Sequence, residues 1–478
     1  MNTDWLTLLP LILLAGTGTL IFCLGAFFRQ VETVLLVGLA VLACLACAGS
    51  ALFVHPAPGN FSGLLAIDLF NTFYTVLFAA ITFITLLFSS QYARERDFAG
   101  DEFLGIILFA VVGMILIATA IHWLLFFLGL ELLSISLYVL IAIRRGDVLG
   151  IEAAVKYFIM GAVASAFVVF GIALLYGATG TLAIRQSLEL AGQPANRLLS
   201  LFGLCLILVG IGFKISVVPF HLWTPDVYQG APAPITAFLA TGTKVALLAM
   251  FVRLAMYGGA GPGNVLAPAL WIMAALTMVV GNITALAQTQ IKRMLAYSSI
   301  AQMGYMLMAL LAFKHQGGAA VVFYSVVYAF MDLGAFGVVG LFSPKESDRD
   351  AIADYKGLGY VQPGKAALLT LCLFSLAGLP ATAGFIGKFV LFRAALESNL
   401  IGLALIGILT AIISLYFYLN IVVVLYMRPA EKNTVTITTG NEGILACFLI
   451  AAIIFWLGLF PSSTLTLIEK IVEQLISV

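Results

Sequence analysis

The segment KISVVPFHLWTPDVYQGAPAP, residues 214–234, decides how this chain folds, because it places a helix break inside an apolar run. Pro219 lacks a backbone donor and clashes with the preceding helical turn. Lys214 precedes this break and His221 follows it. Irregular backbone at membrane depth is tolerated only where it is buried in protein or lines a water-filled cavity. The segment therefore predicts a polar path inside a membrane-embedded helical bundle.

A second stretch, SLAGLPATAGFIGKF at residues 375–389, repeats this plan. Gly378, Pro380 and Gly384 interrupt the helix, and Lys388 follows the break. Breaks at corresponding positions in two halves of a chain are a good sequence pointer to a transport path. The two breaks lie five spans apart, and an odd offset predicts repeats of inverted orientation. A strongly apolar sequence can also produce such a spacing by chance.

The composition around these segments is that of a membrane protein. Hydrophobic residues make up 63% of the chain and charged residues 9%, whereas soluble domains carry about 25% charged residues. A net charge of +1 gives no electrostatic footprint for nucleic acid. Runs long enough to span a bilayer predict an all-α integral membrane fold of about 14 transmembrane helices, with the seventh and twelfth broken, at 5–28, 33–54, 67–91, 103–121, 123–143, 151–177, 200–219, 232–257, 265–289, 294–313, 317–342, 366–396, 400–427 and 443–461.

Loop charges test this count, because cytoplasmic loops carry an excess of lysine and arginine. One side of the predicted topology collects about twice as many of these residues as the other: Arg29, Arg94, Arg96, Arg144, Arg145, Lys292, Arg293, Lys345, Arg349, Lys356, Lys365, Arg428 and Lys432, against Arg185, Arg197, Arg253, Lys314, Arg393 and Lys470. An error of one helix would scramble the bias. The bias therefore favours an even number of spans, with both termini on the outer side.

Charged residues within the spans are the candidates for function. Each costs roughly 2.5–3.5 kcal/mol at the bilayer centre on insertion scales. The ionisable residues predicted inside spans are Glu131, Lys156, Lys214, Lys244, Asp332 and Lys388. Left unpaired, they would cost more than a typical protein's stability, so they must face one another, water or a cavity.

Each of these residues also has a purely structural interpretation. Lys156 and Lys388 lie near the ends of their runs, where a lysine can extend to the interface. Glu131 and Lys244 lie roughly 12 and 18 Å deep at 1.5 Å per residue, and a static ion pair is their structural alternative. For Asp332 the alternative is a protonated carboxyl group hydrogen-bonded in the bundle.

Lysine is the informative choice of cation at these positions. Arginine stays charged in proteins, whereas a buried lysine can lose its proton. A carboxylate about 6 Å away contributes roughly 2.8 kcal/mol at an effective dielectric constant of about 20. Moving such a carboxylate by a few ångströms would therefore make a buried lysine bind or release a proton, as a pump requires.

Motifs for redox cofactors are missing from the sequence. The cysteines lie inside apolar runs without iron–sulfur spacing, and neither a G-x-G-x-x-G string nor a Walker A string is present. Histidine has an unperturbed pKa near neutrality, which suits His221 for a proton relay. A structural role for this histidine is equally compatible with its position. No neighbouring histidine or carboxylate cluster indicates a metal site there.

At PFHLWTPDVYQGAP (219–232), IKRMLAYSSIAQMGY (291–305) and GFIGKF (384–389), the sequence resembles the antiporter-like subunits of respiratory complex I, the NADH-quinone oxidoreductase. The first motif is shared in part with Mrp-type cation/proton antiporters, and the other two are more specific to the subunit N branch. The resemblance covers nearly the whole chain. It implies fourteen helices and two inverted five-helix repeats.

The resemblance also implies roles for individual residues. Glu131 and Lys214 resemble a coupling ion pair, Lys244 a central channel lysine and Lys388 a terminal one. Two further residues match connecting positions, namely Lys156 and His221. Asp332 departs from the family pattern, which often has an uncharged polar residue at that position.

The resemblance implies a proton-translocating subunit that carries no redox cofactor, while NADH, FMN, iron–sulfur clusters and quinone belong to partner subunits. It places the chain in a bacterial inner membrane, beside other membrane subunits of complex I. The expected division is an N-terminal segment 1–102, a first repeat 103–257, a second repeat 265–427, and a last helix with a short tail in 428–478. The alternatives are an Mrp-type Na⁺/H⁺ antiporter subunit, an organic-solute transporter, and a membrane scaffold with inert lysines.

Overall fold

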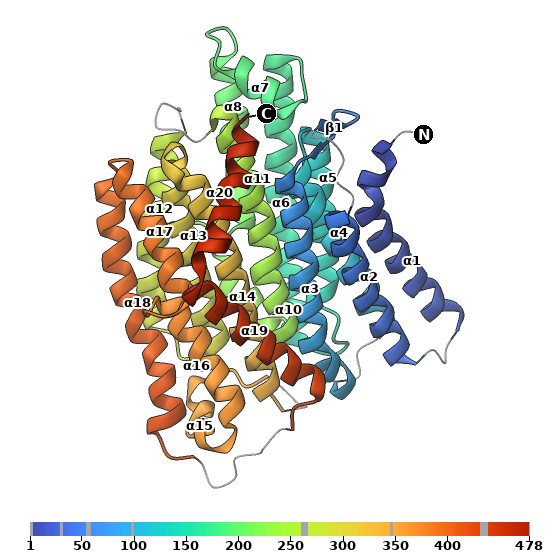
Figure 1. Ribbon diagram of the computed structural model, residues 1–478, viewed down its shortest axis with the longest axis vertical. Coiled ribbons are helices and arrows are strands. Elements are labelled where there is room, and N and C mark those ends of the chain that lie inside the picture. Colours follow the sequence, from blue (N-terminus) through green and yellow to red (C-terminus); the bar gives the residue numbers. More distant parts are fainter. Residues whose placement is uncertain are drawn as a thin grey trace.

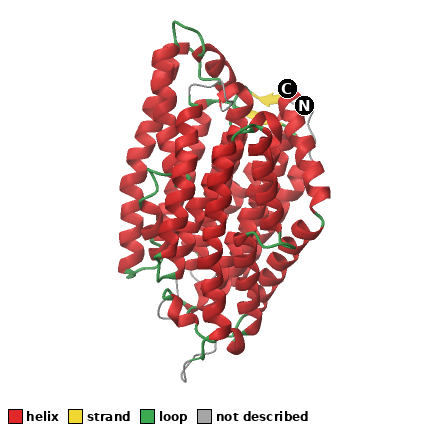
Figure 2. Cartoon of the chain, turned by 90° about the vertical axis from the view of Figure 1, so that its left-hand side faces the viewer, coloured by secondary structure: helices red, strands yellow, loops and turns green. Residues whose placement is uncertain are grey.

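The structure, a computed structural model, is a bundle of roughly parallel helices with two short strands at one end (Figures 1 and 2). It describes residues 3–28, 32–53, 59–96, 100–259, 266–344, 348–430 and 438–477. Within them, 13 helices are long and apolar enough to cross a membrane. A helix suits this sequence because it satisfies every backbone polar group within the segment, as lipid requires.

The first five spans confirm the predicted division between residues 121 and 123. The α4 helix ends at Thr119 and α5 begins at Trp123. The strands β1 and β2 form an antiparallel hairpin with Gly59 opposite Ile67. The elements of this part are η1 (Thr3–Leu8), α1 (Leu9–Phe27), α2 (Thr33–Phe53), β1 (Gly59–Phe61), β2 (Leu65–Ile67), α3 (Leu69–Glu95), α4 (Gly100–Thr119) and α5 (Trp123–Ile141).

The next part contains the quoted segment 214–234, and the structure interrupts the helix there. Helix α8 ends at Lys214 and helical structure resumes at Trp223. The elements are α6 (Val148–Thr179), α7 (Ile184–Ala191), α8 (Arg197–Lys214), α9 (Trp223–Gly230), α10 (Ala233–Phe238), the π-helical turn η2 (Leu239–Thr243), α11 (Lys244–Leu254) and the π-helical turn η3 (Ala255–Gly259).

The last part contains the second interruption, which divides the run 366–396 into α16 and α17. Counted as one crossing, this pair joins the 13 continuous spans. The elements are α12 (Ala267–Leu286), α13 (Ile291–Leu311), η4 (Phe313–Gly317), α14 (Gly318–Phe342), η5 (Ile352–Tyr355), α15 (Leu358–Val361), α16 (Pro363–Ala377), α17 (Ala383–Glu397), α18 (Ile401–Met427), α19 (Asn441–Leu459) and α20 (Pro461–Ser477).

The C-terminal tail differs from the expected short extension. Its described residues form the helix α20, which runs up the face of the bundle after α19 (Figure 1). One side of this helix is buried against α3 and α14, through Ile468, Ile471, Val472 and Leu475. The apolar residues recur at helical spacing, and the span count had left them outside the last predicted run.

Three membrane-spanning segments form the centre of the bundle: residues 233–258, α13 and α14. In the apolar part of each segment, all residues are buried for 233–258 and α14, and 94% are buried for α13. In the most apolar part of the outer helices α1, α2, α6, α18 and α19, fewer than half of the residues are buried. This arrangement puts the central helices in a lipid-free interior, where polar side chains can meet.

The loops group at two ends as the predicted topology requires. Both described chain ends lie at the same end of the molecule (Figure 2). Backbone bridges Leu65–Ala120 and His122–Ala183 join loops assigned to the side of the termini, and Gln290–Ala351 joins two loops assigned to the other side. Each bridge therefore connects loops that the charge analysis placed together.

We expect reporter fusions to read opposite sides of the membrane when placed after Val478 and after Arg145. The excess of positive loop charge predicts that the Arg145 side is cytoplasmic. A periplasm-active and a cytoplasm-active reporter should give complementary activities at each position. Equal signals at the two positions would contradict the alternation of spans.

Candidate proton pathway

The central lysine of the bundle lies at the start of α11. Lys244 is fully buried, and its ammonium donates a hydrogen bond to the Ser299 hydroxyl on α13. The ring of Tyr228 lies 5.5 Å from the Lys244 nitrogen, at cation–π distance. None of the described residues forms a carboxylate ion pair with Lys244. The lysine is therefore held by neutral polar and aromatic groups.

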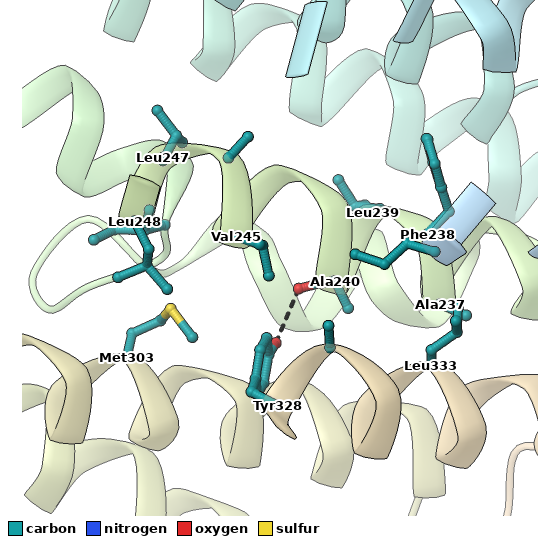
Figure 3. Close-up of a cluster of buried hydrophobic side chains, with 14 of the residues drawn as sticks. Ala237, Phe238, Leu239, Ala240, Val245, Leu247, Leu248, Met303, Tyr328 and Leu333 are labelled. Carbon is teal, nitrogen blue, oxygen red and sulfur yellow. Dashed lines mark hydrogen bonds between the residues drawn. The ribbon is translucent and has the colours of Figure 1, made fainter. Parts of the chain in front are cut away.

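A local distortion of the helix precedes this lysine. The π-helical turn η2 ends at Thr243, directly before Lys244, and π-turns inside helices occur frequently at functional sites. At this turn the Tyr328 hydroxyl of α14 donates to the Ala240 carbonyl at 2.9 Å (Figure 3). In the same view, the apolar side chains of Met303 and Leu333 lie on either side of this hydrogen bond (Figure 3). Residues 239–243 contain no proline, and no other sequence pattern there predicts this π-helical turn.

The first lysine, Lys214, lies at the end of α8 and is 1% exposed. Its ammonium donates to the Ser134 hydroxyl at 2.6 Å and to the Tyr138 hydroxyl at 3.2 Å, both on α5. Glu131 is only half-buried and accepts a hydrogen bond from Ser165 on α6. Among the described residues Glu131 and Lys214 form no direct ion pair. The Lys214 ammonium instead binds Ser134, which follows Glu131 by one helical turn.

Aromatic side chains fill the space from Lys214 toward Lys244. The Tyr157 ring lies 5.2 Å from the Lys214 nitrogen and stacks on Trp223 with centroids 4.5 Å apart. Trp223 in turn contacts Tyr228, at 6.2 Å between centroids. The Tyr157 and Tyr228 hydroxyls are buried without a hydrogen-bond partner among the described residues. Such hydroxyls are available to bind water.

The third lysine, Lys388, binds the backbone at the interruption between α16 and α17. Its ammonium donates to the Leu376 carbonyl at 2.7 Å and to the Ala377 carbonyl at 3.1 Å, at the end of α16. Gly378 ends that helix with a φ of 84°, in the left-handed region that favours glycine. Lys388 is 5% exposed, so the alternative of an interfacial lysine does not fit its position.

Hydroxyl and amide groups extend from Lys388 toward Lys244. The Gln302 amide lies 3.5 Å from the Leu376 carbonyl that Lys388 also binds, and it donates to the Tyr418 hydroxyl at 3.3 Å. Tyr418 contacts the Ser298 hydroxyl, and Ser298 is the neighbour of the Lys244 partner Ser299 on α13. Polar groups therefore lie between the two lysines, with a carbonyl acceptor shared by Lys388 and Gln302 at one point and a gap between the adjacent serines at another.

Lys156 and His221 lie outside this buried axis. Lys156 is 44% exposed and pairs with Glu152 at 2.7 Å and with Asp226 at 3.2 Å. Asp226 also binds Arg293 at 2.6 Å, a network that the sequence analysis missed. His221 lies in the interrupted segment, is 8% exposed, and has no partner for its Nδ1 atom among the described residues.

Several ion pairs with buried cations were also missed, because their partners are distant in sequence. Arg253 of α11 binds Asp68 at the start of α3, at 3.0 Å. At the opposite end Asp348 accepts from Lys292 at 2.9 Å and from Tyr92 at 2.8 Å. It lies in a cavity of about 440 Å³ lined by Tyr92, Arg144, Arg145, Gly146, Asp147, Val148, Leu149, Gln229, Gly230, Pro232, Lys292, Asp348 and Asp350.

We expect Asp348→Asn to destabilise the protein by about 3 kcal/mol or more, because it removes the carboxylate that pairs with the buried Arg96 and leaves Lys292 with the Asp350 carboxylate alone, 3.5 Å away. Burial raises the pKa of Asp348, but Lys292, Arg96 and Tyr92 outweigh burial and hold this pKa below its usual value. A depressed pKa stabilises the fold above the unfolded value of about 3.9, and this contribution disappears as the pH falls through the folded value. The loss should therefore be constant from about pH 5 to 8.

Thermal unfolding of the detergent-solubilised protein at several pH values would measure this difference. Asp147→Asn is the matched control, because Asp147 lines the same cavity, is 23% exposed and pairs with Arg144. An exposed pair of this kind contributes about 1 kcal/mol or less. Equal destabilisation by the two substitutions would contradict the role assigned to Asp348.

Among the described residues no group of three or more histidine, cysteine, aspartate or glutamate side chains could hold a metal ion. The lysines of the axis contact hydroxyls, carbonyls and aromatic rings. Such a set can bind, release and pass protons.

Comparison with known proteins identifies the family. Residues 120–414 match the family described as "NADH:quinone oxidoreductase/Mrp antiporter, TM". The chain is 43% identical over 469 residues to NADH-quinone oxidoreductase subunit N of Geotalea uraniireducens, with 98% of each chain covered. The chain belongs to the subunit N family of NADH-quinone oxidoreductases.

Other members of the subunit N family agree with this assignment. Subunit N 1 of Solidesulfovibrio magneticus is 48% identical over 395 residues, which cover 82% of this chain and 84% of the relative. A chain of respiratory complex I from Thermus thermophilus has the same fold, with a TM-score of 0.82 and 35% identity over 96% of this chain and 98% of that one. The predicted resemblance and the all-helical membrane fold are confirmed.

Proposed function

We propose that this subunit N family member translocates protons across the membrane while partner subunits transfer electrons from NADH to quinone. The observation that carries the proposal is the burial of Lys214, Lys244 and Lys388 in the bundle interior. None of the three has a carboxylate ion-pair partner among the described residues. A buried lysine in such surroundings gives up its proton far more readily than an arginine would.

The proposed path runs along the middle of the membrane from Lys214 through Lys244 to Lys388. Lys214 and Lys244 donate hydrogen bonds to hydroxyl groups. From the region of Lys388, the side chains of Gln302, Tyr418 and Ser298 lead toward Lys244. Hydroxyls both donate and accept hydrogen bonds, so they can pass a proton on. His221, beside the first break, is proposed as a relay, and Lys156 as an exposed residue that connects the path to Asp226.

Glu131 is proposed as the group that couples this path to its neighbours. It lies on α5 and binds Ser165 of α6, on a largely apolar surface where Leu128 and Ile135 are 58% and 56% exposed. A half-buried carboxylate at this depth is costly against lipid. A neighbouring membrane subunit that covers this face would remove the cost and could move the negative charge toward or away from Lys214.

Several further features belong to this proposal. NADH, FMN, iron–sulfur clusters and quinone are assigned to partner subunits, which include other antiporter-like subunits. The chain is assigned to a bacterial inner membrane with both termini outside. The interruptions before α9 and before α17 support the division into repeats 103–257 and 265–427, flanked by 1–102 and 428–478.

The test of the proposal is Glu131→Gln in the assembled complex. Removing the charge while keeping the side chain's shape should reduce NADH-driven proton uptake into inverted membrane vesicles severalfold. The physical reason is that a carboxylate about 6 Å from a lysine contributes roughly 2.8 kcal/mol to its ammonium form. Rates are compared with NADH oxidation by an artificial acceptor, which reports on the peripheral partners alone.

Purification in mild detergent supplies the second part of the test. Copurification with redox subunits is expected, whereas isolation with cation-antiporter subunits would favour the Mrp-type alternative. Normal proton uptake by assembled Glu131→Gln complexes would exclude a coupling role for Glu131. Normal uptake after replacement of Lys214 would favour a scaffold with inert lysines.

A further inference from the structure

Asp332 is the carboxylate nearest to the middle of the axis, and the roles above do not use it. It lies on α14 with no exposed surface. Its Oδ2 atom accepts a hydrogen bond from Tyr328 at 3.0 Å, one helical turn earlier. Its Oδ1 atom is buried without a hydrogen-bond partner among the described residues. A permanently charged carboxylate with a single donor is poorly stabilised at such a site.

Three hydrogen bonds connect this carboxylate to Lys244. The Lys244 ammonium donates to Ser299, the Ser299 and Tyr328 hydroxyls are 2.7 Å apart, and Tyr328 donates to Asp332. An ammonium only donates and an ionised carboxylate only accepts. The two hydroxyls between them can therefore both point from the lysine toward the aspartate. All four side chains are fully buried.

The Tyr328 hydroxyl stands at a fork in this chain. It has one proton but lies within hydrogen-bond distance of two acceptors, Asp332 Oδ2 and the Ala240 carbonyl at 2.9 Å (Figure 3). Directed at Asp332, the proton completes the chain from Lys244. Directed at Ala240, it interrupts the chain. Because Ala240 belongs to the π-helical turn that ends next to Lys244, the turn offers the alternative acceptor.

We propose that Asp332 is an internal proton acceptor for Lys244, reached through Ser299 and Tyr328. This inference rests on the proposed function and adds a residue to it. The ammonium proton passes to the Ser299 oxygen, the serine proton to the Tyr328 oxygen, and the tyrosine proton to Asp332 Oδ2. One N–H and two O–H bonds break and three O–H bonds form, so that ammonium and carboxylate become amine and carboxylic acid.

The exchange leaves the total charge of the site unchanged. The state with an ammonium and a carboxylate and the state with an amine and a carboxylic acid both have zero net charge, and the low-dielectric interior does not strongly penalise the transfer. Asp332 also offsets part of the cost of burying Lys244 as a cation. The site can hold its proton on Asp332 while the Lys244 amine accepts the next one.

The test uses Asp332→Asn and Tyr328→Phe in the intact complex. Asp332→Asn removes the acceptor, and Tyr328→Phe removes the link while leaving the carboxylate in place. We expect each to lower proton uptake per NADH oxidised by about twofold or more, as for loss of a proton-transfer group. The double variant should be no worse than the single ones, because both remove the same chain.

Infrared difference spectra between the resting and reduced complex report directly on protonation of a carboxyl group. A substitution that only disturbs side-chain packing would not change this signal. A C=O stretching band of a protonated carboxyl should be missing in Asp332→Asn and weakened in Tyr328→Phe. Tyr74→Phe is the matched control, because Tyr74 is equally buried and its hydroxyl lies 3.5 Å from Ser325, also on α14. It should retain both the band and the uptake ratio.

Uptake ratios and infrared bands in Asp332→Asn and Tyr328→Phe that match those of Tyr74→Phe would overturn the inference. Multiplicative losses in the double variant would also overturn it, because they would mean that the two residues act independently. Replacement of Lys244 separates this failure from failure of the proposed function. If Lys244→Met pumps normally, both fall; if it does not pump while Asp332→Asn does, only the inference about Asp332 falls.

Discussion

Lys244→Met should assemble into the complex and lose at least about tenfold in NADH-driven proton uptake, in line with the loss of a positioned proton-transfer group. Methionine has a similar length and an apolar end, so the buried site remains filled. The variant loses the hydrogen bond to Ser299 and the group that exchanges the proton. Initial rates of uptake into inverted vesicles, normalised to subunit content, measure the effect.

Lys244→Arg separates charge from proton exchange at the same position. A guanidinium stays protonated in proteins, so this variant keeps a cation and should still pump poorly. Lys365→Met is the matched control, since Lys365 is 8% exposed and donates to the Leu341 carbonyl away from the axis. Full uptake by Lys244→Arg would show that fixed charge suffices and that protonation of this lysine does not matter.

The second large effect is expected at Lys388, for which two losses are combined. Lys388→Met should leave the Ala377 carbonyl without its donor and the Leu376 carbonyl with only the long 3.5 Å contact from Gln302, and an unsatisfied buried group costs about 1–3 kcal/mol. It should also interrupt the proton path, so that uptake falls about tenfold or more. The amount of assembled complex and the uptake per complex are measured separately, because only the second reports on proton transfer.

Two further variants divide these contributions. Lys388→Arg keeps hydrogen-bond donors for the carbonyls, so it should assemble well and pump poorly. Gly384→Ala should impair assembly itself, because its added methyl carbon would lie 1.7 Å from the Ser375 carbonyl oxygen. Assembled Lys388→Arg complex with wild-type uptake would leave this lysine a purely structural role and end the path at Lys244.

The depth of the candidate lysines was predictable from the sequence, and their orientation was not. Proline and glycine inside apolar runs marked both interruptions, since they disrupt helical hydrogen bonding wherever they occur. Lys156 shows the limit. Its helix, α6, is apolar on every side, and without an amphipathic pattern the sequence does not tell which face is buried. The structure places Lys156 on the exposed face, where it pairs with Glu152 and Asp226.

The contacts between distant segments were also beyond the sequence. Ser299 and Tyr328 surround Lys244 only because α11, α13 and α14 pack together. Asp348 binds Lys292, 56 positions away, and nothing in either segment selects the other. The π-helical turn before Lys244 likewise depends on the neighbouring helix, whose Tyr328 hydroxyl binds the Ala240 carbonyl.

The hydrogen bonds of Lys388 have a consequence for how its break survives turnover. A lysine ammonium carries three hydrogens, and the end of α16 presents two carbonyls to it. The third hydrogen is spare. When it departs, the amine that remains still has two hydrogens, one for each carbonyl. If Lys388 exchanges protons as proposed, the contact between Lys388 and the end of α16 is therefore kept in both protonation states, and one side chain can hold the interruption together while it carries protons.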